Sequence, residues 1–325
     1  MRARRRPPAS GTSRYRDRVD SLTGLLDGPR ARGAFLLRSL LEPPYALRIE
    51  DEAPLTVLTL VRGVAWVLPD EGEPVELRPH DVALIRGPGH YTVADEPGTP
   101  WQTLIGPGQT CTTLTGPDRT TGMDVGGRTW GDGPHGGTLL LTGTYQLRSE
   151  VSRRLLTALP ALLVRPGATG PVELLAAEIG RPEPGQELVL DRILDLLLVA
   201  VLRGWLAAPG SGAPSWYRAR DDSVVGPVLR LLHEQPARPW TVAGLAERSG
   251  VSRSALARRF TDLVGEPPMA YLTGWRLTLA ADLLREPEAT IGAVARQVGY
   301  GSSFALSAAF KRERGMSPQE FRRQA

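Results

Sequence analysis

The chain has 325 residues, 41% of them hydrophobic and 23% charged, which is the composition of a globular protein with room for two or three domains. Its single cysteine, Cys111, excludes an internal disulfide and a metal site built from several cysteines, and its longest apolar run is interrupted by Asp195 and Arg203, which excludes a membrane-spanning helix and favours a cytoplasmic location. The net charge of +4 is unevenly distributed, because residues 1–20 carry +5 and residues 221–325 carry +3, and basic ends around an acidic middle indicate a polyanionic partner.

Residues 1–20 form a basic N-terminal tail whose composition predicts disorder. The tail starts MRARRRPPAS and lacks the apolar segment of a secretory signal. Its arginines either contact a polyanion or are simply solvated, and the sequence leaves both interpretations open.

Residues from about 30 to 146, within a domain placed at 21–146, are predicted to form β-strands. Runs such as PLTVLTLVRGVAWVLP, DVALIR and TLLLTGTYQL are short, rich in β-branched residues and bounded by Gly, Pro and Asp. Strands spaced this closely, with no helical pattern between them, predict a sandwich or a barrel. Trp66, Arg86 and His90 would lie near the mouth of such a barrel, where an aromatic side chain beside polar groups is typical of a small-molecule pocket. The alternative is that these three are ordinary core and loop residues.

Residues 147–207 change to a helical pattern. The segments SEVSRRLLTALPALLV, VELLAAEIG and QELVLDRILDLLLVAVLRGWL place apolar residues three and four positions apart. The third segment is apolar over much of its circumference, which predicts either a helix buried within its own domain or one that also packs on a second subunit. Residues 208–220 start with small uncharged residues and are predicted to be a linker.

Residues 221–325 contain an internal repeat, in which one set of residues recurs 49 or 50 positions later. The first copy comprises Val242, Leu245, Ala246, Gly250, Ser252, Leu256 and Phe260, and the second comprises Ile291, Val294, Ala295, Gly299, Ser302, Leu306 and Phe310. Each copy predicts a helix, a glycine suited to a left-handed C-terminal position, a serine N-cap and a second helix with one apolar face. The region is therefore predicted to contain a helix-turn-helix twice.

The second helix of the first copy has an outward face that suits the major groove of DNA. Ser254 and Ala257 are small enough for close approach, and Arg258 can donate two hydrogen bonds to a guanine edge. Arg253 and Arg259 are placed for phosphate contacts. Arginines that merely solvate a surface are the alternative, which the repetition of turn, cap and apolar face disfavours.

The segment PPMAYLTGWRLTLAADLLREP, which joins the two copies, predicts one long amphipathic helix that starts after two prolines. About eighteen residues give it a length of roughly 27 Å. Such a spacer would suit two recognition helices in successive major grooves, which are about 34 Å apart.

Residues 221–325 resemble the DNA-binding domain of the AraC/XylS family of bacterial transcription regulators. The resemblance rests on WTVAGLAERSGVSRSALARRFTDLVGEPPMAYLTGWRL, AADLL and IGAVARQVGYGSSFALSAAFKRERGMSPQEFR. The segment YALRIEDEAPLTVLTLVRGVAWVLPDEGEPVELRPHDVALIRGPGHYTVAD is similar to the cupin-type N-terminal domain of that family. The resemblance implies an α+β chain, with a cupin-like β-barrel over 21–146, trailing helices over 147–207 and an all-α, seven-helix domain over 221–325.

The resemblance also implies a function and its contact residues. The expected function is sequence-specific DNA binding in transcription regulation, modulated by an unidentified small-molecule effector in the N-terminal barrel. The implied base contacts are Ser254, Ala257, Arg258, Ser303, Phe304 and Ser307, and the implied phosphate contacts are Arg253, Arg259, Arg276, Lys311 and Arg312. Many family members carry an arginine where this chain has Ala308. The second unit is left with serine hydroxyls and with an apolar contact to a thymine methyl through Phe304 or Ala305. The alternative for Phe304 is that its ring packs into the domain.

Cupin enzymes are the rival class, because many of them hold a metal with paired histidines and a glutamate. The four histidines, His80, His90, His135 and His233, include no His-x-His pair, and the sequence has no phosphate-binding loop or nucleophile elbow. We therefore expect no catalysis, metal or cofactor. A third interpretation is a constitutive DNA-binding protein whose barrel only dimerises. The expected partners are double-stranded promoter DNA and an effector, with a second copy of the chain and RNA polymerase as further candidates.

Overall fold

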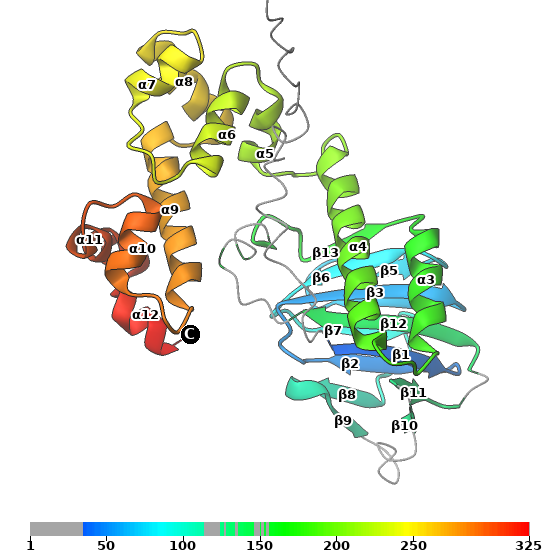
Figure 1. The fold of residues 1–325 in the computed structure, drawn as a ribbon. Coiled ribbons are helices and arrows are strands. Elements are labelled where there is room, and N and C mark those ends of the chain that lie inside the picture. The colour runs from blue at the N-terminus through cyan, green and yellow to red at the C-terminus, as the bar shows by residue number, and fades with distance from the viewer. Residues whose placement is uncertain are drawn as a thin grey trace, which may run out of the picture.

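The computed structural model describes residues 35–113, 124–126, 128–133, 136–145, 150, 153 and 156–324. Within these ranges the chain forms a β-rich N-terminal region with covering helices and a helical C-terminal region (Figure 1). The basic tail predicted over residues 1–20 lies outside the described residues, so its disorder stays a prediction.

The described strands of the N-terminal region form two sheets. The first has the strand order β10-β11-β1-β12-β3-β6-β13, and the second has the order β5-β4-β7-β2-β8-β9. The strands are β1 (Phe35–Leu41), β2 (Ala46–Ile49), β3 (Leu55–Arg62), β4 (Ala65–Pro69), β5 (Val75–Leu77), β6 (Val82–Arg86), β7 (Tyr91–Ala94), β8 (Thr103–Gly106), β9 (Thr110–Thr113), β10 (Asp124–Gly126), β11 (Thr129–Gly131), β12 (Thr138–Tyr145) and β13 (Leu162–Arg165). Closure of the two sheets into one barrel is not seen among these strands, so the barrel stays a prediction.

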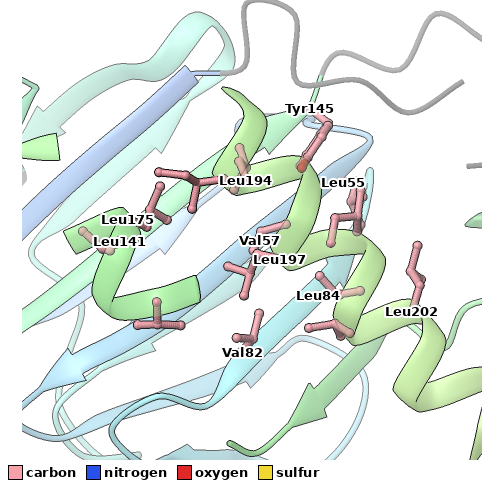
Figure 2. Close-up of a cluster of buried hydrophobic side chains, with 14 of the residues drawn as sticks. Leu55, Val57, Val82, Leu84, Leu141, Tyr145, Leu175, Leu194, Leu197 and Leu202 are labelled. Carbon is pink, nitrogen blue, oxygen red and sulfur yellow. The ribbon is translucent and has the colours of Figure 1, made fainter. Parts of the chain in front are cut away.

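The first sheet is buried on both faces, because its strands alternate between two cores. On β3, Leu58 and Leu60 pack toward the second sheet, whereas Leu55 and Val57 pack toward the helices. Figure 2 shows the core on the helical side, with Leu197 of the covering helix among the strand residues. The result is three layers: the second sheet, the first sheet and a helical layer.

Helices α3 (Thr169–Ile179) and α4 (Gln186–Ala207) form the helical layer, in agreement with the helical pattern of their sequence. Gly143 on β12 allows α4 to lie close to the sheet, because a Cβ atom at that position would lie 2.7 Å from Leu194 of α4. The inward side of α4 is buried. Its outward side leaves Leu188 62% exposed and Leu196 53% exposed.

The end of the first predicted helical segment is a strand. β13 pairs antiparallel with β6, with Leu163 opposite Leu84. The prediction of a helix over SEVSRRLLTALPALLV is therefore wrong for its last residues. An extended segment there satisfies backbone groups at the edge of β6 that would otherwise lack partners.

The second half of the segment predicted to be a linker is a packed connection. It contains helix α5 (Ser215–Arg218) and the 3-10 helix η2 (Ala219–Asp221). Trp216 packs both against the core beneath α4 and against a core of the C-terminal region. The Ser215 hydroxyl donates a hydrogen bond of 2.7 Å to the backbone carbonyl of Val264.

Seven helices follow η2 within the described residues, as the family resemblance implies. They are α6 (Val225–Glu234), α7 (Val242–Arg248), α8 (Arg253–Val264), α9 (Pro268–Leu284), α10 (Ile291–Val298), α11 (Ser303–Arg314) and α12 (Pro318–Gln324). α9 runs between α7 and α8 at one end and α10, α11 and α12 at the other (Figure 1). The start of α9 packs in a core with Leu256 and Phe260, and its second half packs in a separate core with Leu306 and Phe310.

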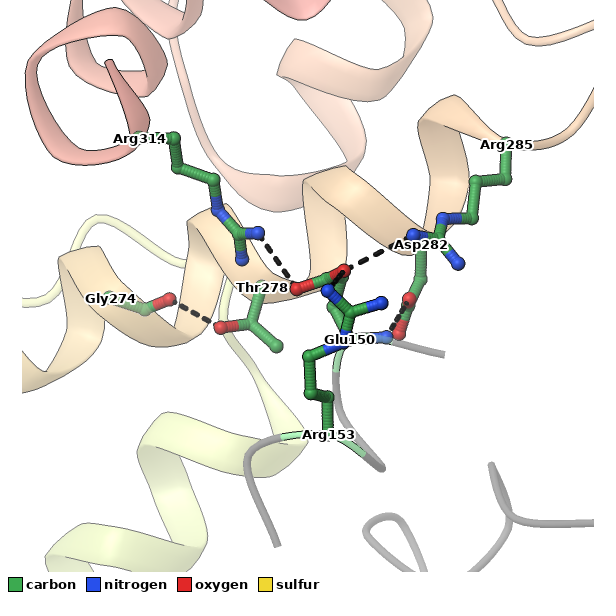
Figure 3. A network of polar contacts seen from close by, with 7 residues as sticks. All are labelled: Glu150, Arg153, Gly274, Thr278, Asp282, Arg285 and Arg314. Atoms are coloured by element: carbon green, nitrogen blue, oxygen red, sulfur yellow. Dashed lines mark hydrogen bonds and ion pairs between the residues drawn. The ribbon is translucent and has the colours of Figure 1, made fainter. Parts of the chain in front are cut away.

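Glu150 connects the N-terminal region to the second half of the C-terminal region (Figure 3). Its side chain is 6% exposed, and its carboxylate accepts hydrogen bonds from Arg314 at 2.8 Å and from Arg285 at 3.1 Å. Arg153 lies 3.3 Å from the same carboxylate, and the Glu150 backbone N–H donates to Asp282 of α9. Because Arg285 is the C-cap of α9 and Arg314 is the last residue of α11, one carboxylate holds the C-terminal ends of both helices.

Candidate nucleic-acid interface

The first helix-turn-helix unit consists of α7 and α8, and its turn has the predicted chemistry. The Ser252 hydroxyl accepts a hydrogen bond of 3.2 Å from the Ala255 N–H and so caps α8. Gly250 has a φ of +68°, the left-handed conformation predicted for it. The Val251 N–H closes the end of α7 on the carbonyl of Ala246 at 3.1 Å.

The second unit, α10 and α11, repeats this construction. The Ser302 hydroxyl accepts from the Ala305 N–H at 3.1 Å, and the Tyr300 N–H donates to the Ala295 carbonyl at 2.7 Å. Gly299 has a φ of +89°, and a Cβ atom there would lie 2.7 Å from Ala237, so both conformation and space require glycine. Tyr300 matches Val251 at an offset of 49 and Ser302 matches Ser252 at 50, so the second turn has the one extra residue that the repeat predicts.

The first recognition helix, α8, presents its predicted base-contact residues to the outside. Ser254 and Arg258 are exposed and Ala257 is half-buried. Together with Val242, which begins α7, the start of α8 borders a shallow hollow lined by Ser252, Arg253, Ser254 and Ala257. Sequence reasoning placed Val242 only in the apolar pattern of the repeat and did not predict its position at this surface.

The second recognition helix, α11, presents an uncharged start. Ser303 and Ala308 are exposed and Ser307 is half-buried. Phe304 is 82% exposed, so the interpretation in which its ring packs into the domain is wrong.

Arg259, a predicted phosphate contact, is held by a carboxylate. Its guanidinium donates to Asp222 through Nε at 3.1 Å and through Nη2 at 2.7 Å. Arg259 and the backbone N–H groups of Val224 and Val225 lower the pKa of Asp222 to about 2. The negative charge thereby connects α8 to the start of α6.

Arg276 lies on α9, and its side chain makes contacts within the domain. Its guanidinium donates to the backbone carbonyls of Pro236 at 2.7 Å and Arg238 at 2.8 Å, and burial lowers its pKa. Lys311 and Arg312, on α11, are exposed, and Arg312 pairs with Glu313 at 3.1 Å. Of these residues, Lys311 and Arg312 have the more accessible positions for a phosphate.

The structure does not bring Trp66, Arg86 and His90 together at a cavity. Trp66 alternates with buried Ala65 and Val67 on β4 and therefore points away from the core. His90 is exposed, with Nδ1 3.8 Å from a Glu50 oxygen, and Arg86 ends β6.

A cavity of about 140 Å³ lies instead between the inner faces of the two sheets. Its walls are mainly apolar, and its polar groups include Asp51, which accepts a hydrogen bond of 2.9 Å from Gln109. The lining residues are Phe35, Leu37, Ser39, Leu47, Ile49, Asp51, Leu58, Tyr91, Val93, Ile105, Gln109, Cys111, Trp130, Leu140 and Thr142. Sequence reasoning missed this set because its members come from many strands of both sheets.

Neither a metal-binding cluster nor a membrane-spanning helix is found in the described ranges. There, no group of three or more His, Cys, Asp or Glu side chains is placed to hold a metal ion; His135 lies outside these ranges. In the same part of the chain, no helix combines the length and the apolarity needed to cross a membrane.

A two-sheet region followed in the chain by two capped helix-turn-helix units defines a two-domain protein of the helix-turn-helix class. Residues 20–207 match the family model described as Cupin, and residues 245–324 match the one described as Helix-turn-helix domain. The chain belongs to the cupin family and, with the domain that follows, is an AraC-type protein.

Relatives of known name are described as transcription regulators. A Streptomyces lividans protein named as an AraC-like transcription regulator is 39% identical over 191 residues, covering 57% of this chain and 63% of that protein. The HTH-type transcriptional regulator AlkR of Acinetobacter baylyi is 34% identical over 196 residues, covering 58% of this chain and 64% of AlkR. The match thus spans less than two thirds of either relative. Among solved structures, the DNA-binding domain of AdpA in complex with a target DNA is 32% identical, with a TM-score of 0.30, over 32% of this chain and 93% of that chain.

Proposed function

We propose that this protein binds double-stranded promoter DNA in a sequence-specific manner and regulates transcription, with RNA polymerase as a candidate further partner. The observation that carries the proposal is the pair of helix-turn-helix units, each with a serine-capped second helix whose start is exposed. The names of the relatives support the same class of function.

In this proposal α8 enters the major groove by its N-terminal half. Arg258 donates to a guanine edge, while Ser254 and Ala257 permit the close approach that the contact needs. Arg253, at the start of α8, contacts a phosphate. Arg259 and Arg276 already use Nε and Nη2 in the contacts described above, so we assign them smaller contributions.

In the second unit, Ser303, Phe304 and Ser307 contact bases, while Lys311 and Arg312 contact phosphates. α9 has 17 residues, which corresponds to about 26 Å, and it sets the separation of the two units. That length suits recognition helices in successive major grooves on one side of DNA.

The effector site that we propose is the cavity between the sheets. Its volume of about 140 Å³ suits a small organic molecule of roughly the size of a substituted benzene ring. Its apolar walls favour a mainly apolar molecule, and Asp51 and Gln109 would orient one hydrogen-bonding group. We assign no chemical step to this site; the molecule acts by its difference in affinity between two states of the protein.

A second copy of the chain is the partner that we propose for the outward side of α4. Leu188 and Leu196 lie two helical turns apart and are both more than half exposed. Glu187 lies in the first turn of the helix and Arg203 lies near its end, so an antiparallel pair of α4 helices would bring these opposite charges together.

Selection of bound sequences from a random pool of double-stranded DNA by the full chain tests the proposed function. We expect enrichment of one motif with two parts about one helical turn apart. A parallel selection with the Ser254→Glu, Arg258→Glu variant is the control, because these changes reverse the charge of the exposed α8 face and leave the buried core intact. Enrichment of no motif by the unchanged chain would contradict the proposal.

A further inference from the structure

Phe304 is the most exposed large apolar side chain of the described residues, at 82%. The apolar face that α11 needs for folding is supplied by Leu306 and Phe310, which are both fully buried. Ring exposure at Phe304 therefore serves no packing purpose in this domain. An exposed apolar group of this size indicates a surface that another molecule covers.

The position of Phe304 in the repeat identifies which molecule covers it. Phe304 is the second residue of α11, two positions after the Ser302 cap, and it matches Ser254 of α8 at an offset of 50. If α8 contacts bases through Ser254, the equivalent residue of α11 lies over base edges as well.

The surroundings of Phe304 differ from those of Ser254 in charge. Arg253 and Arg258 of the first unit correspond to Ser303 and Ala308 of the second, so the start of α11 has no charged side chain before Lys311. The guanine contact available to α8 has no counterpart here. The main apolar feature that a base pair offers in the major groove is the 5-methyl group of thymine.

We propose that the second unit recognises a thymine by its 5-methyl group through the ring of Phe304, which makes the two units chemically different readers of one site. This inference rests on the proposed function, since it requires α11 to enter the major groove. Burying the ring against the methyl group removes apolar surface of both from water. Ser303 and Ser307 can bond to several bases and therefore add little discrimination.

The test replaces each thymine of the selected motif by deoxyuridine, one position at a time, because uracil keeps the hydrogen-bonding groups of thymine and lacks only the methyl. For the unchanged chain we expect a three- to fivefold loss of affinity, about the effect of one buried methyl group, at one or two positions of one half-site. The Phe304→Ala variant should bind thymine and uracil sites equally. Phe304→Leu should keep part of the difference.

Ser254→Ala, at the matched position of the first unit, is the control variant and should keep the full thymine preference. Thermal unfolding of Phe304→Ala should match that of the unchanged chain, since the ring is exposed. If uracil is neutral at every position while the motif is still bound, the inference is wrong and the proposed function stands. If Phe304→Ala lowered the affinity for thymine and uracil sites by the same factor relative to the unchanged chain, the preference for thymine would remain, and the inference would also be wrong. Failure to select any motif would refute both.

Discussion

Four arginines of the C-terminal region fall into two groups according to the contacts of their side chains. Arg259 and Arg276 have their guanidinium groups in short contacts with Asp222 and with backbone carbonyls, so their first role is in the fold. Arg253 and Arg258 are exposed at the start of α8. Substitutions in the first group should therefore change stability, and substitutions in the second should change DNA affinity.

Arg258→Ala should weaken binding to the selected motif by about 1–3 kcal/mol and remove the preference at one base pair, because a contact with two hydrogen bonds is lost. Fluorescence anisotropy with motif and scrambled DNA measures both effects. Arg253→Ala is the comparison, and it should weaken both DNAs similarly and reduce the salt dependence by about one counterion. An equal loss on both DNAs for Arg258→Ala would make Arg258 a phosphate contact.

Asp222→Asn should lower the free energy of unfolding at pH 7 by about 1 kcal/mol, because a charge-assisted contact with Arg259 is replaced by a neutral one. The folded pKa of about 2 lies below the ordinary value of about 3.9. The stabilisation is therefore complete above about pH 4 and is lost as the pH falls through 2.

Urea unfolding at pH 7 and near pH 2.5 measures this difference between the Asn variant and the unchanged chain. Asp221→Asn is the matched control, since its side chain is 80% exposed. A difference of the same size at both pH values would show that the charge of Asp222 contributes nothing.

Among the helices and strands, those with local signals were predictable. The cap, the left-handed glycine and the apolar face of each helix-turn-helix depend on residues within about twenty positions, and the pattern repeats, so both units were predicted and are confirmed. β13 was not, because LLV fits a helix and a strand equally well and only the edge of β6 decides between them.

The N-terminal cavity could not be predicted from the sequence, because its position also depends on long-range pairing. Trp66, Arg86 and His90 are close in the sequence, but a cavity between sheets is made by residues that pairing brings together from distant strands, such as Leu37 and Ile105. At the second recognition helix the sequence left Phe304 undecided, because a ring next to a cap can turn either way; its exposure resolves the question.

For α4, the prediction concerns the proposed dimer contact on its outward side. Leu196→Glu should convert a dimer to a monomer, because it places a charge at the centre of the proposed antiparallel contact. Size-exclusion chromatography with light scattering measures the mass. Leu263→Glu, which changes a 38% exposed leucine of α8 in the same way, should leave the mass unchanged. A monomeric mass for the unchanged chain at micromolar concentration would refute the proposed dimer.

For the whole molecule, Glu150 and Trp216 connect the two regions at different places. Trp216 contacts the first unit and Glu150 contacts the second, so the N-terminal region touches both ends of the DNA-binding part. β12, whose Leu140 and Thr142 line the cavity, ends five positions before Glu150. A change at the cavity therefore has a short path along the chain to α9 and α11.

Glu150→Gln should weaken the contact between the regions by about 1–3 kcal/mol, because Arg285 and Arg314 lose a buried counter-charge. We expect a larger radius of gyration by small-angle X-ray scattering and faster proteolysis within residues 208–214. Glu173→Gln, at an exposed carboxylate of α3, is the control. Unchanged scattering and unchanged proteolysis would show that the charge of Glu150 does not hold the regions together.

The two cores along α9 have a consequence for how the energies of the two units combine. Tyr271 and Leu272 belong to the first core, Leu277 and Leu284 belong to the second, and Trp275 lies between them. The recognition helix α8 packs in the first core and α11 packs in the second. Sites in separate cores contribute nearly additively to free energy, so exchanging a base contact in one recognition helix should change the contribution of the other little. The preference for each half of the DNA site can then change by single substitutions, without compensating changes in the other half.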